Sequence, residues 1–504
     1  MTTNIRIYKG LSRREHAGWV LGLRPGQAFV CILLAVPVVM ALAAGNLIEA
    51  LMLTAICGPV AGLVVIPVRG RPAVRWLGHL ALFQVGMVFG WSRWQSNVAG
   101  GRAVDPDEPD LPGVLTRLRF PDGPPLRDAG RVCLIHDTGE GRWGATARLT
   151  HGGVGMLSDA QCERLANRLG NLLLSIGHRD VIDRMSLLVR TVPDDGAEYE
   201  AWRHRNESAD APELARRATT ELDRTVGAVS VRHEVFVTLS GTEEALRKPA
   251  TAAGGGIAGR AAALYRVLDG LEDKLKALGA QSVKWLSGGE LAEAIRTGFN
   301  PASAAVLAAR HHSDRSDSSR GVAWATAGPT HAPTPTGRAY HHDGFATVSY
   351  SVLMPEAGTV FGSLGALLAV KTAGERRSLA IHYETLSQRR ARSAVRGNRF
   401  RAGVVRDWKS SKGFNSTAAD AREAGGARAQ EKAVAAGHGI VRFAVATAVT
   451  VPSSWNLEDH AARVENDIAG RFQLLRMELA QDSSFVAAVL PVGIGLPRLR
   501  GGGL

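Results

Sequence analysis

Motifs with a defined chemistry are nearly absent from this 504-residue chain. A P-loop needs the pattern G-x-x-x-x-G-K-[ST], and the chain contains no Gly-Lys dipeptide, which excludes nucleotide hydrolysis of that type. Residues 254–259 do satisfy G-x-G-x-x-G. A dinucleotide site requires this pattern in a tight turn directly after a strand, whereas here a long stretch separates it from the preceding predicted strand. We therefore expect a flexible entry to a helix at 254–259 and no bound cofactor.

The histidines and cysteines do not form a site with a recognised spacing either. His341, His342 and Asp343 come closest to a set of metal ligands, but they border a segment rich in Ser, Pro, Thr and Gly, where solvent exposure explains them. No G-x-S-x-G elbow occurs. No C-x-x-C pair is present, so neither a disulfide framework nor a zinc site is indicated by Cys31, Cys57, Cys133 and Cys162. We expect no catalytic residue and no metal.

A strongly basic segment lies between residues 389 and 412. It holds a single acidic residue, Asp407, and two aromatic residues, Phe400 and Trp408. Such a segment could bind the phosphates of DNA or of lipid headgroups. The alternative is a solvated helical face that docks on an acidic protein. The positive residues are Arg389, Arg390, Arg392, Arg396, Arg399, Arg401, Arg406, Lys409 and Lys412.

An apolar run near the N-terminus predicts a membrane anchor. Residues 28–68 contain one carboxylate, Glu49, and no Lys or Arg, which gives about twice the ~20 apolar residues that a spanning helix needs. We expect a transmembrane hairpin with helices at about 28–44 and 50–68. Gly58 and Gly62 form a G-x-x-x-G pattern that lets two membrane helices approach closely, although such a pattern also arises by chance in a glycine-rich chain.

Positive charge flanks the hairpin on both sides and is absent from its turn, which predicts that both ends lie in the cytoplasm and the turn outside. The flanking residues are Arg6, Lys9, Arg13, Arg14 and Arg24 before the run, and Arg69, Arg71, Arg75 and Arg93 after it. We therefore expect a multi-pass protein of the cell membrane with cytoplasmic N- and C-termini. A cleaved signal peptide is the alternative, because basic residues followed by an apolar core also fit that layout.

A third apolar stretch, residues 76–91, is short for a span. Tryptophans and arginines at its borders are typical of the headgroup layer, so we expect an interfacial helix. The alternative is a third span, which would reverse the topology and place everything after residue 95 outside the cell.

The composition beyond the apolar region is that of a folded protein. Its strand and helix signals alternate, so we expect a membrane-anchored α+β architecture with ferredoxin-like α+β units. Residues 1–96 form the basic head, the hairpin and the interfacial helix. A Pro/Gly/Asp linker at 97–112 leads to a first α+β domain at 113–308. A flexible loop at 309–342 precedes a second α+β block at 343–504.

Hydrophobic periodicity predicts the elements of both blocks. In the first block we expect strands at 142–150, 182–191, 229–239 and 282–286, and helices at 159–174, 213–226 and 259–278. In the second block we expect strands at 346–354, 378–384 and 440–451, helical stretches over 386–437 and 457–475, and a strand or loop at 485–496. The blocks share a strand-helix-strand rhythm, but too few identical residues to indicate an internal repeat.

Several segments resemble a family of membrane proteins. Tyr8-Lys9-Gly10, GRPAVRW (70–76), LPGVL (111–115) and RTVPD (190–194), placed around a two-helix hairpin, resemble actinobacterial membrane proteins encoded beside type IV secretion and conjugation ATPases. VRHEVFVTLS (231–240) and the tail from 435 to 496 also resemble the non-motor portion of a conjugative secretion ATPase. EccE membrane subunits of type VII secretion have a similar layout.

The resemblance implies a docking domain fused to a membrane anchor, with the P-loop motor supplied by another chain. We therefore expect a non-enzymatic structural subunit whose partners are a secretion-system ATPase, other membrane subunits and anionic lipid. A formal net charge of +13 fits an acidic partner or membrane face. The alternative is a membrane-anchored nucleic-acid-binding or hydrolytic protein, based on the 389–412 segment and the histidines.

Overall fold

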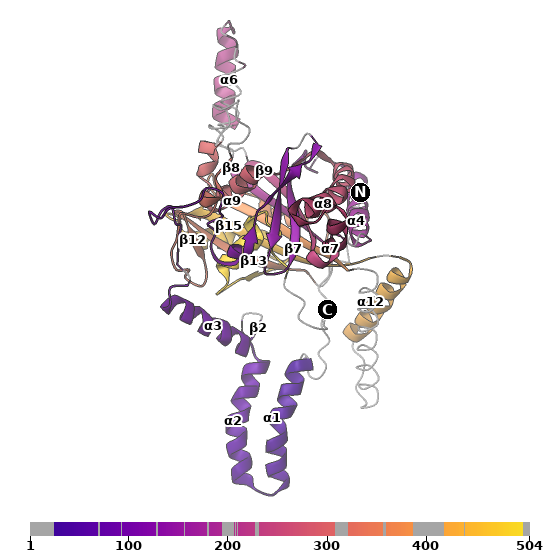
Figure 1. Ribbon diagram of the computed structural model, residues 1–504. Coiled ribbons are helices and arrows are strands. Elements are labelled where there is room, and N and C mark those ends of the chain that lie inside the picture. The colour runs from indigo at the N-terminus through magenta and orange to yellow at the C-terminus, as the bar shows by residue number, and fades with distance from the viewer. Residues whose placement is uncertain are drawn as a thin grey trace, which may run out of the picture.

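The computed structural model describes residues 25–68, 71–91, 93–127, 130–155, 157–178, 181–193, 206, 208, 210–226, 231–307, 321–355, 359–386, 418–437 and 439–496. Over these ranges the chain forms an α+β body built on a large antiparallel sheet (Figure 1). A helical N-terminal region extends from one side of that body.

Twelve strands of the described residues join in one sheet, with the main order β12-β13-β15-β14-β8-β9-β7-β6-β4. β10 also pairs with β7, β16 with β13 and β5 with β6. The strands before residue 300 are β4 (Leu118–Arg119), β5 (Asp122–Pro125), β6 (Arg131–Asp137), β7 (Arg142–His151), β8 (Arg184–Pro193), β9 (Val231–Thr242) and β10 (Ala280–Trp285). The later strands are β12 (Tyr340–His342), β13 (Phe345–Leu353), β14 (Arg376–Leu386), β15 (Ile440–Pro452) and β16 (Gln473–Arg476).

Helices connect these strands, and two of them begin at capping boxes. The Ser158 and Gln161 side chains cap the first turn of α4, as Ser287 and Glu290 do for α9, which satisfies backbone N–H groups that have no partner within the helix. The helices of the body are α4 (Asp159–Gly177), α6 (Glu213–Val226), α7 (Glu243–Ala252), α8 (Gly256–Ala277), α9 (Gly288–Phe299), α12 (Ala418–Ala435), α13 (Leu457–Ile468) and α14 (Gln481–Val489). Short 3₁₀ helices are η2 (Gly113–Arg117), η4 (Trp324–Thr326) and η5 (Ser363–Leu368).

The body consists of two units that follow the same order of elements. The first runs β6, β7, α4, β8, an insertion with α6, β9, α7 and α8, β10 and α9. The second runs β12, β13, η5, β14, an insertion with α12, β15, α13, β16 and α14. Pairing repeats as well, because β6 and β10 share the outer edge of β7 just as β12 and β16 share the outer edge of β13.

The units join where β8 pairs antiparallel with β14, in a register that sets Leu187 opposite Ile381. The two predicted α+β blocks therefore share one sheet. Three residues after Leu187 in β8 and after Ile381 in β14, each strand forms an ion pair with its neighbour in its own unit. These are Arg190–Glu234 at 2.7 Å in the first unit and Glu384–Arg442 at 2.5 Å in the second, with the charges exchanged.

Side chains of the sheet pack against helices on both faces. Leu187 and Ile381 point to the same face because they are paired, and there they meet the clusters formed by α4 and α8 in one unit and α13 in the other. Leu188 and Ala380 point to the opposite face, where α9 and α14 cover the sheet. The body is thus a three-layer arrangement of helices, sheet and helices.

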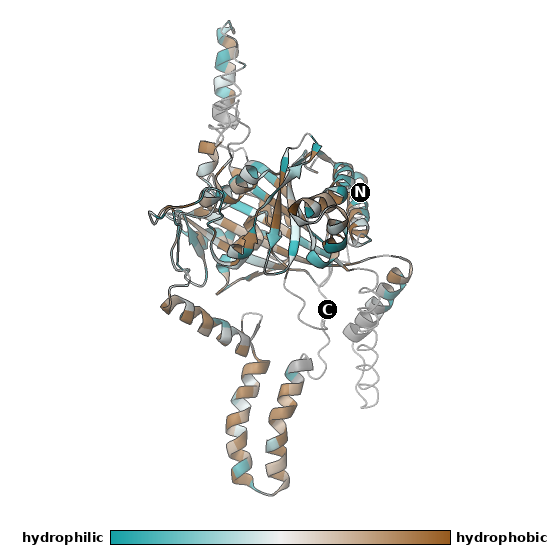
Figure 2. Ribbon diagram, in the orientation of Figure 1, coloured by the Kyte–Doolittle hydropathy of each residue, from teal (hydrophilic) through white to brown (hydrophobic). Residues whose placement is uncertain are grey.

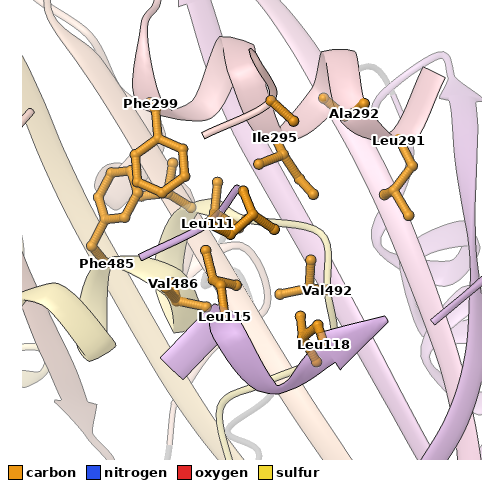
Figure 3. Close-up of a cluster of buried hydrophobic side chains, with 14 of the residues drawn as sticks. Leu111, Leu115, Leu118, Leu291, Ala292, Ile295, Phe299, Phe485, Val486 and Val492 are labelled. Carbon is orange, nitrogen blue, oxygen red and sulfur yellow. The ribbon is translucent and has the colours of Figure 1, made fainter. Parts of the chain in front are cut away.

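The central cluster on the α9–α14 face joins parts of the chain that lie far apart in sequence (Figure 3). Leu115 comes from η2, Phe299 from the end of α9 and Phe485 from α14, and none of the three is more than 1% exposed. The rings of Phe299 and Phe485 are 5.0 Å apart. Leu111, at the end of the predicted 97–112 linker, is buried in the same cluster, so this part of the linker belongs to the core.

One glycine fixes the approach of β9 to the chain that leads into β8. A Cβ atom at Gly241 would lie 1.7 Å from the carbonyl oxygen of Val181 and 2.8 Å from its carbonyl carbon. Because both atoms belong to the backbone, no side-chain rotation relieves the overlap. Gly241 therefore permits the close contact between the two strands at this end of the sheet.

Most predicted elements that fall on described residues are confirmed, whereas two at the C-terminus are wrong. Of the helical stretch predicted over 386–437, residues 387–417 lie outside the described residues, Leu386 ends β14, and α12 covers Ala418–Ala435. The helix predicted over 457–475 ends at Ile468, and β16 follows after Gly470, whose φ of 77° stops a helix. The strand or loop predicted over 485–496 begins as helix α14, followed by an irregular segment. Because α14 is buried on nearly all sides, its sequence lacks the polar face that would distinguish a helix from a strand.

The segment predicted as a flexible loop at 309–342 is structured over 321–342. It contains η4, β11 (His331–Ala332) and β12, and it buries Trp324 and Tyr340 in the core. β11 pairs with β3 (Trp94–Gln95), which follows the N-terminal helices. Strand β6 and helices α7 and α9 were not predicted, because short apolar stretches give a weak periodic signal.

Candidate functional site

The N-terminal region consists of two antiparallel helices, α1 (Pro25–Ala43) and α2 (Leu47–Val65), that extend away from the body (Figure 1). A tight turn joins them, with Gly45 at φ 74°. The Asn46 side chain caps α2 by accepting from the Glu49 backbone N–H at 3.4 Å. At the other end, Gln27 Nε2 donates to the Val64 carbonyl oxygen at 2.6 Å. The predicted helix boundaries are thus close to those observed.

Both helices consist of apolar residues over most of their length (Figure 2), and many of these side chains are exposed. Leu51 on α2, for example, is 74% exposed. By length and composition, α2 is the one helix of the described residues that is long and apolar enough to cross a membrane, and only 6% of its apolar window is buried. In α1 the apolar stretch is the shorter Phe29–Ala43. The structure therefore contains one candidate span where the sequence predicts two.

Gly58 and Gly62 do not contact α1 in the single chain. A Cβ atom at Gly58 would meet nothing within 4 Å, and one at Gly62 would meet only Ile66, in the residues that end α2. The close approach of two membrane helices expected from the G-x-x-x-G pattern stays a prediction.

The nine positive residues between Arg389 and Lys412 lie outside the described residues. The ends of the segment that contains them are described, since β14 ends at Leu386 and α12 begins at Ala418. In the view of Figure 1, α12 lies on the side of the body that faces α1 and α2, whereas α6 extends in the opposite direction.

A chain of alternating charges borders a recess that is lined by residues of β6, β7, β8 and β9 and by residues 492–495. Asp137 contacts Arg117 at 3.0 Å, and Arg184 bridges Glu140 at 2.6 Å and Glu384 at 3.3 Å. Burial alone would raise the pKa of Glu140, but the hydrogen bond and charge of Arg184 hold it below its usual value. Since the charges in the recess are matched, it has the character of a structural network rather than an ion-binding site.

A second network is buried in the second unit. Glu375 and Arg377 have fully buried side chains and meet at 2.5 Å. Arg377 also donates to Asp467 at 2.8 Å, and Glu375 contacts His460 Nδ1 at 2.7 Å. Lys371 pairs with the other oxygen of Asp467. These side chains attach α13 to the start of β14.

Two further histidines are buried with neutral partners. His382 Nε2 faces the Ala487 carbonyl oxygen at 2.9 Å and therefore donates, so Nδ1 accepts from the Ser186 hydroxyl at 2.8 Å. The pair resembles a nucleophile and its base, but both side chains are buried. Burial lowers the pKa of His382 to about 4.

His342 is held in the same way. Its ring nitrogens lie 2.5 Å from the Phe299 carbonyl oxygen and 2.8 Å from Thr347 Oγ1, and burial lowers its pKa to about 3. Asp343 pairs with Arg296 at 2.8 Å. Neither residue is available as a metal ligand, and no group of three or more metal-binding side chains occurs in the part of the chain that the structure describes.

These networks were not predicted from the sequence, although the residue pattern of β14 indicates some of their members. Ser378, His382 and Glu384 lie on one side of a strand that also carries Leu379, Ala380 and Ile381, which indicates polar side chains pointing into a covered face. A scan against protein-family models finds no match for this chain, and a search of curated proteins finds none either.

Proposed function

We propose that the protein is a non-enzymatic integral membrane subunit of a bacterial secretion or conjugation machine, which docks a separate secretion ATPase at the inner face of the membrane. The observation that carries the proposal is the exposed apolar surface of α2, which is long enough to cross a bilayer. Soluble monomers rarely expose continuous apolar patches of this extent, because contact with water makes them unfavourable.

In this proposal α1 enters the membrane with α2 as a transmembrane hairpin. The polar Asn46–Glu49 turn then lies outside the cell, and the arginines at 69, 71 and 75 hold the other end inside. Both termini and the body lie in the cytoplasm. Insertion also satisfies the backbone, because every span is helical.

The two units of the body support a structural role. In the first, β7, β8, β9 and β10 lie in the order β10-β7-β9-β8 and are joined as β-α-β-β-α-β, which is the arrangement of a ferredoxin-like unit. The second repeats that order with β13 to β16. The polar clusters described above are matched internally, and the P-loop pattern is missing from the sequence, so the energy for transport comes from another chain.

Helix α6 is the candidate surface for the ATPase. It extends from the side of the body opposite to α1 and α2 (Figure 1). Leu214 is 79% exposed and Leu222 is 57% exposed, and with Ala218 they form one apolar ridge at four-residue spacing. An isolated helix of 14 residues is marginal in water, so a partner that covers this ridge would stabilise it.

Membrane insertion is tested first. The full chain should stay in the pellet after carbonate extraction at high pH, and the variant Ile56→Arg, with a charge in the middle of α2, should be released. Glu49→Gln, at the polar turn, is the matched control and should behave as wild type. Release of the wild-type chain would contradict the anchor.

Topology is tested with single cysteines in a variant that lacks the four native ones. A cysteine at Gly45, in the turn, should react with an impermeant maleimide in intact cells. A cysteine at Ser453, on the exposed surface of the body, should react only after lysis. Labelling at Ser453 in intact cells would refute the cytoplasmic location.

Docking is tested by co-purification of the detergent-solubilised full chain with a co-expressed P-loop secretion ATPase. Leu214→Asp and Leu222→Asp should each reduce the amount of ATPase recovered. Thr220→Asp, on the polar side of the same helix, should leave it unchanged. Equal recovery with all three variants would exclude α6 as the docking surface.

A further inference from the structure

Helix α3 (Ala73–Val88) follows α2 and has two faces with different surroundings. One face carries Trp76, Leu80 and Phe83, which are partly buried. Phe83 lies against the turn of the body at Gly337, with ring atoms 3.6 Å from the position of a Cβ at that glycine. This face therefore packs toward the body.

The other face of α3 is apolar but has no protein partner among the described residues. Val88 is 82% exposed and Leu82 is 66% exposed. The helical period places the polar residues His79 and Gln84 at the two borders of this face. The apolar side chains on it are Val74, Leu77, Ala81, Leu82, Val85 and Val88.

The orientation of α3 excludes a simple continuation of the membrane span. Only the short strands β1 (Pro67–Val68) and β2 (Arg71–Pro72) separate it from α2, and α3 then runs at a steep angle to that helix (Figure 1). Its apolar part, Trp76–Val88, is too short for a span, because a bilayer core of about 30 Å needs about 20 helical residues.

The ends of α3 have the composition of a membrane surface. Residues 66–95 contain four arginines and no Asp or Glu, so this segment complements anionic headgroups. Trp91 follows the helix, is 70% exposed and stacks on Phe89 with ring centroids 5.6 Å apart. Exposed tryptophans of this kind favour the boundary between headgroups and acyl chains.

The body is attached firmly to the far end of α3. Trp94 Nε1 donates to the Pro329 carbonyl oxygen at 3.2 Å, and β3 pairs with β11. The Asn97 backbone N–H and side chain both donate to Asp110, at 2.6 and 3.1 Å. A partner that binds the outer face of α3 therefore also fixes the position of the sheet relative to that partner.

We propose that α3 lies along the cytoplasmic surface of an anionic bilayer, with the Val74–Val88 apolar face in the headgroup–acyl boundary and the Trp76–Phe83 face against the body. The inference rests on the proposed anchoring by α2 and adds the ligand of α3, a lipid surface. In this arrangement α3 is a spacer that fixes the distance and tilt of the body above the membrane.

Site-directed spin labelling of the full chain in vesicles that contain phosphatidylglycerol tests this arrangement. Single cysteines replace Val85 on the outer face, His79 on the polar border and Ile56 in α2. Collision rates with oxygen and with a water-soluble nickel chelate give the depth of each label. We expect Val85 at a depth of about 5–10 Å, His79 in contact with water, and Ile56 near the bilayer centre.

The possible results separate the two proposals. A water-exposed label at Val85 with a deep label at Ile56 would overturn the role of α3 and leave the anchor intact. A label at Val85 as deep as that at Ile56 would mean that α3 spans the membrane, which also overturns the inference. A water-exposed label at Ile56 would refute the anchor itself. Vesicles of neutral lipid should give a severalfold lower oxygen-to-nickel ratio at Val85 than anionic vesicles.

Discussion

Removing one member of the buried Glu375–Arg377 ion pair should strongly destabilise the second unit. Both side chains are fully buried and meet at 2.5 Å. Arg377→Met removes the cation and leaves the carboxylate of Glu375 in the core beside His460 alone. It also deprives Asp467 of the guanidinium at 2.8 Å. A buried charge that loses its partner costs about 3–5 kcal/mol, and we expect a loss of free energy of unfolding in that range.

Two further variants separate the effect of charge from that of packing. In Glu375→Leu/Arg377→Met no unpaired charge remains at the pair itself, so the double variant should be more stable than Arg377→Met alone. Lys371→Ala removes the other partner of Asp467, but Lys371 is 56% exposed, so its loss should cost only about 0.2–1 kcal/mol.

The assay is urea unfolding of the full chain in detergent, followed by pulse proteolysis, which measures the fraction folded at each urea concentration. The double variant and Lys371→Ala are measured beside the wild type under identical conditions. A cost below about 1 kcal/mol for Arg377→Met, or a double variant as unstable as the single one, would refute the dependence of Glu375 on its partner Arg377.

Three other predictions concern the stability of the body. Burial lowers the pKa of His342 to about 3 and that of His382 to about 4, so both stay neutral in the folded protein at pH 5, whereas in the unfolded chain they bind protons below a pKa of 6.5. Each histidine should therefore lower the free energy of unfolding by about 2 kcal/mol at pH 5. Replacing either with Gln should reduce the fall in urea midpoint between pH 7.5 and 5. Gly241→Ala should abolish folding as judged by protease resistance, whereas Gly170→Ala, in open space on α4, should stabilise by about 0.5–1 kcal/mol. Phe485→Ala should lower the free energy of unfolding by about 3–5 kcal/mol in the same urea assay, and a loss below about 1 kcal/mol would contradict its place in the central cluster.

Local patterns were sufficient to predict most of the strands and helices. The strand pattern in 229–239 and the amphipathic spacing in 259–278 correspond to β9 and α8. α8 has one buried face and one outer face, whereas β9 has a core on both of its faces. The α1–α2 pair was predictable because its apolar run is interrupted by Asn46 and Glu49. Helix α14 was not predictable, since burial on nearly all sides removes the alternation of polar and apolar residues that indicates a helix.

Long-range pairing could not be predicted from the chain in the same way. Nothing local to β8 or β14 indicates that they pair, because register depends on two strands that lie almost two hundred residues apart. The buried polar networks likewise join side chains that are distant in sequence: Arg190 contacts Ala294 of α9, and Glu375 contacts His460 of α13. The apolar helices α1 and α2 were therefore predictable from composition alone, whereas the polar networks of the body were not.

The repeated order of elements has an evolutionary consequence. Eight elements that recur in the same order with the same pairing are expected from tandem duplication of one ancestral gene segment, and the exchange of Arg190–Glu234 for Glu384–Arg442 shows how far the copies have diverged. An ancestor with one copy would have formed a homodimer through its β8 edge. In both copies an insertion follows the central strand, after β8 in the first unit and after β14 in the second. Because β8 and β14 pair antiparallel, the two insertions leave from opposite ends of the sheet. Such a fusion would have converted two identical appendages into one on the side of α1 and α2 and one directed away from them, each free to acquire its own partner (Figure 1).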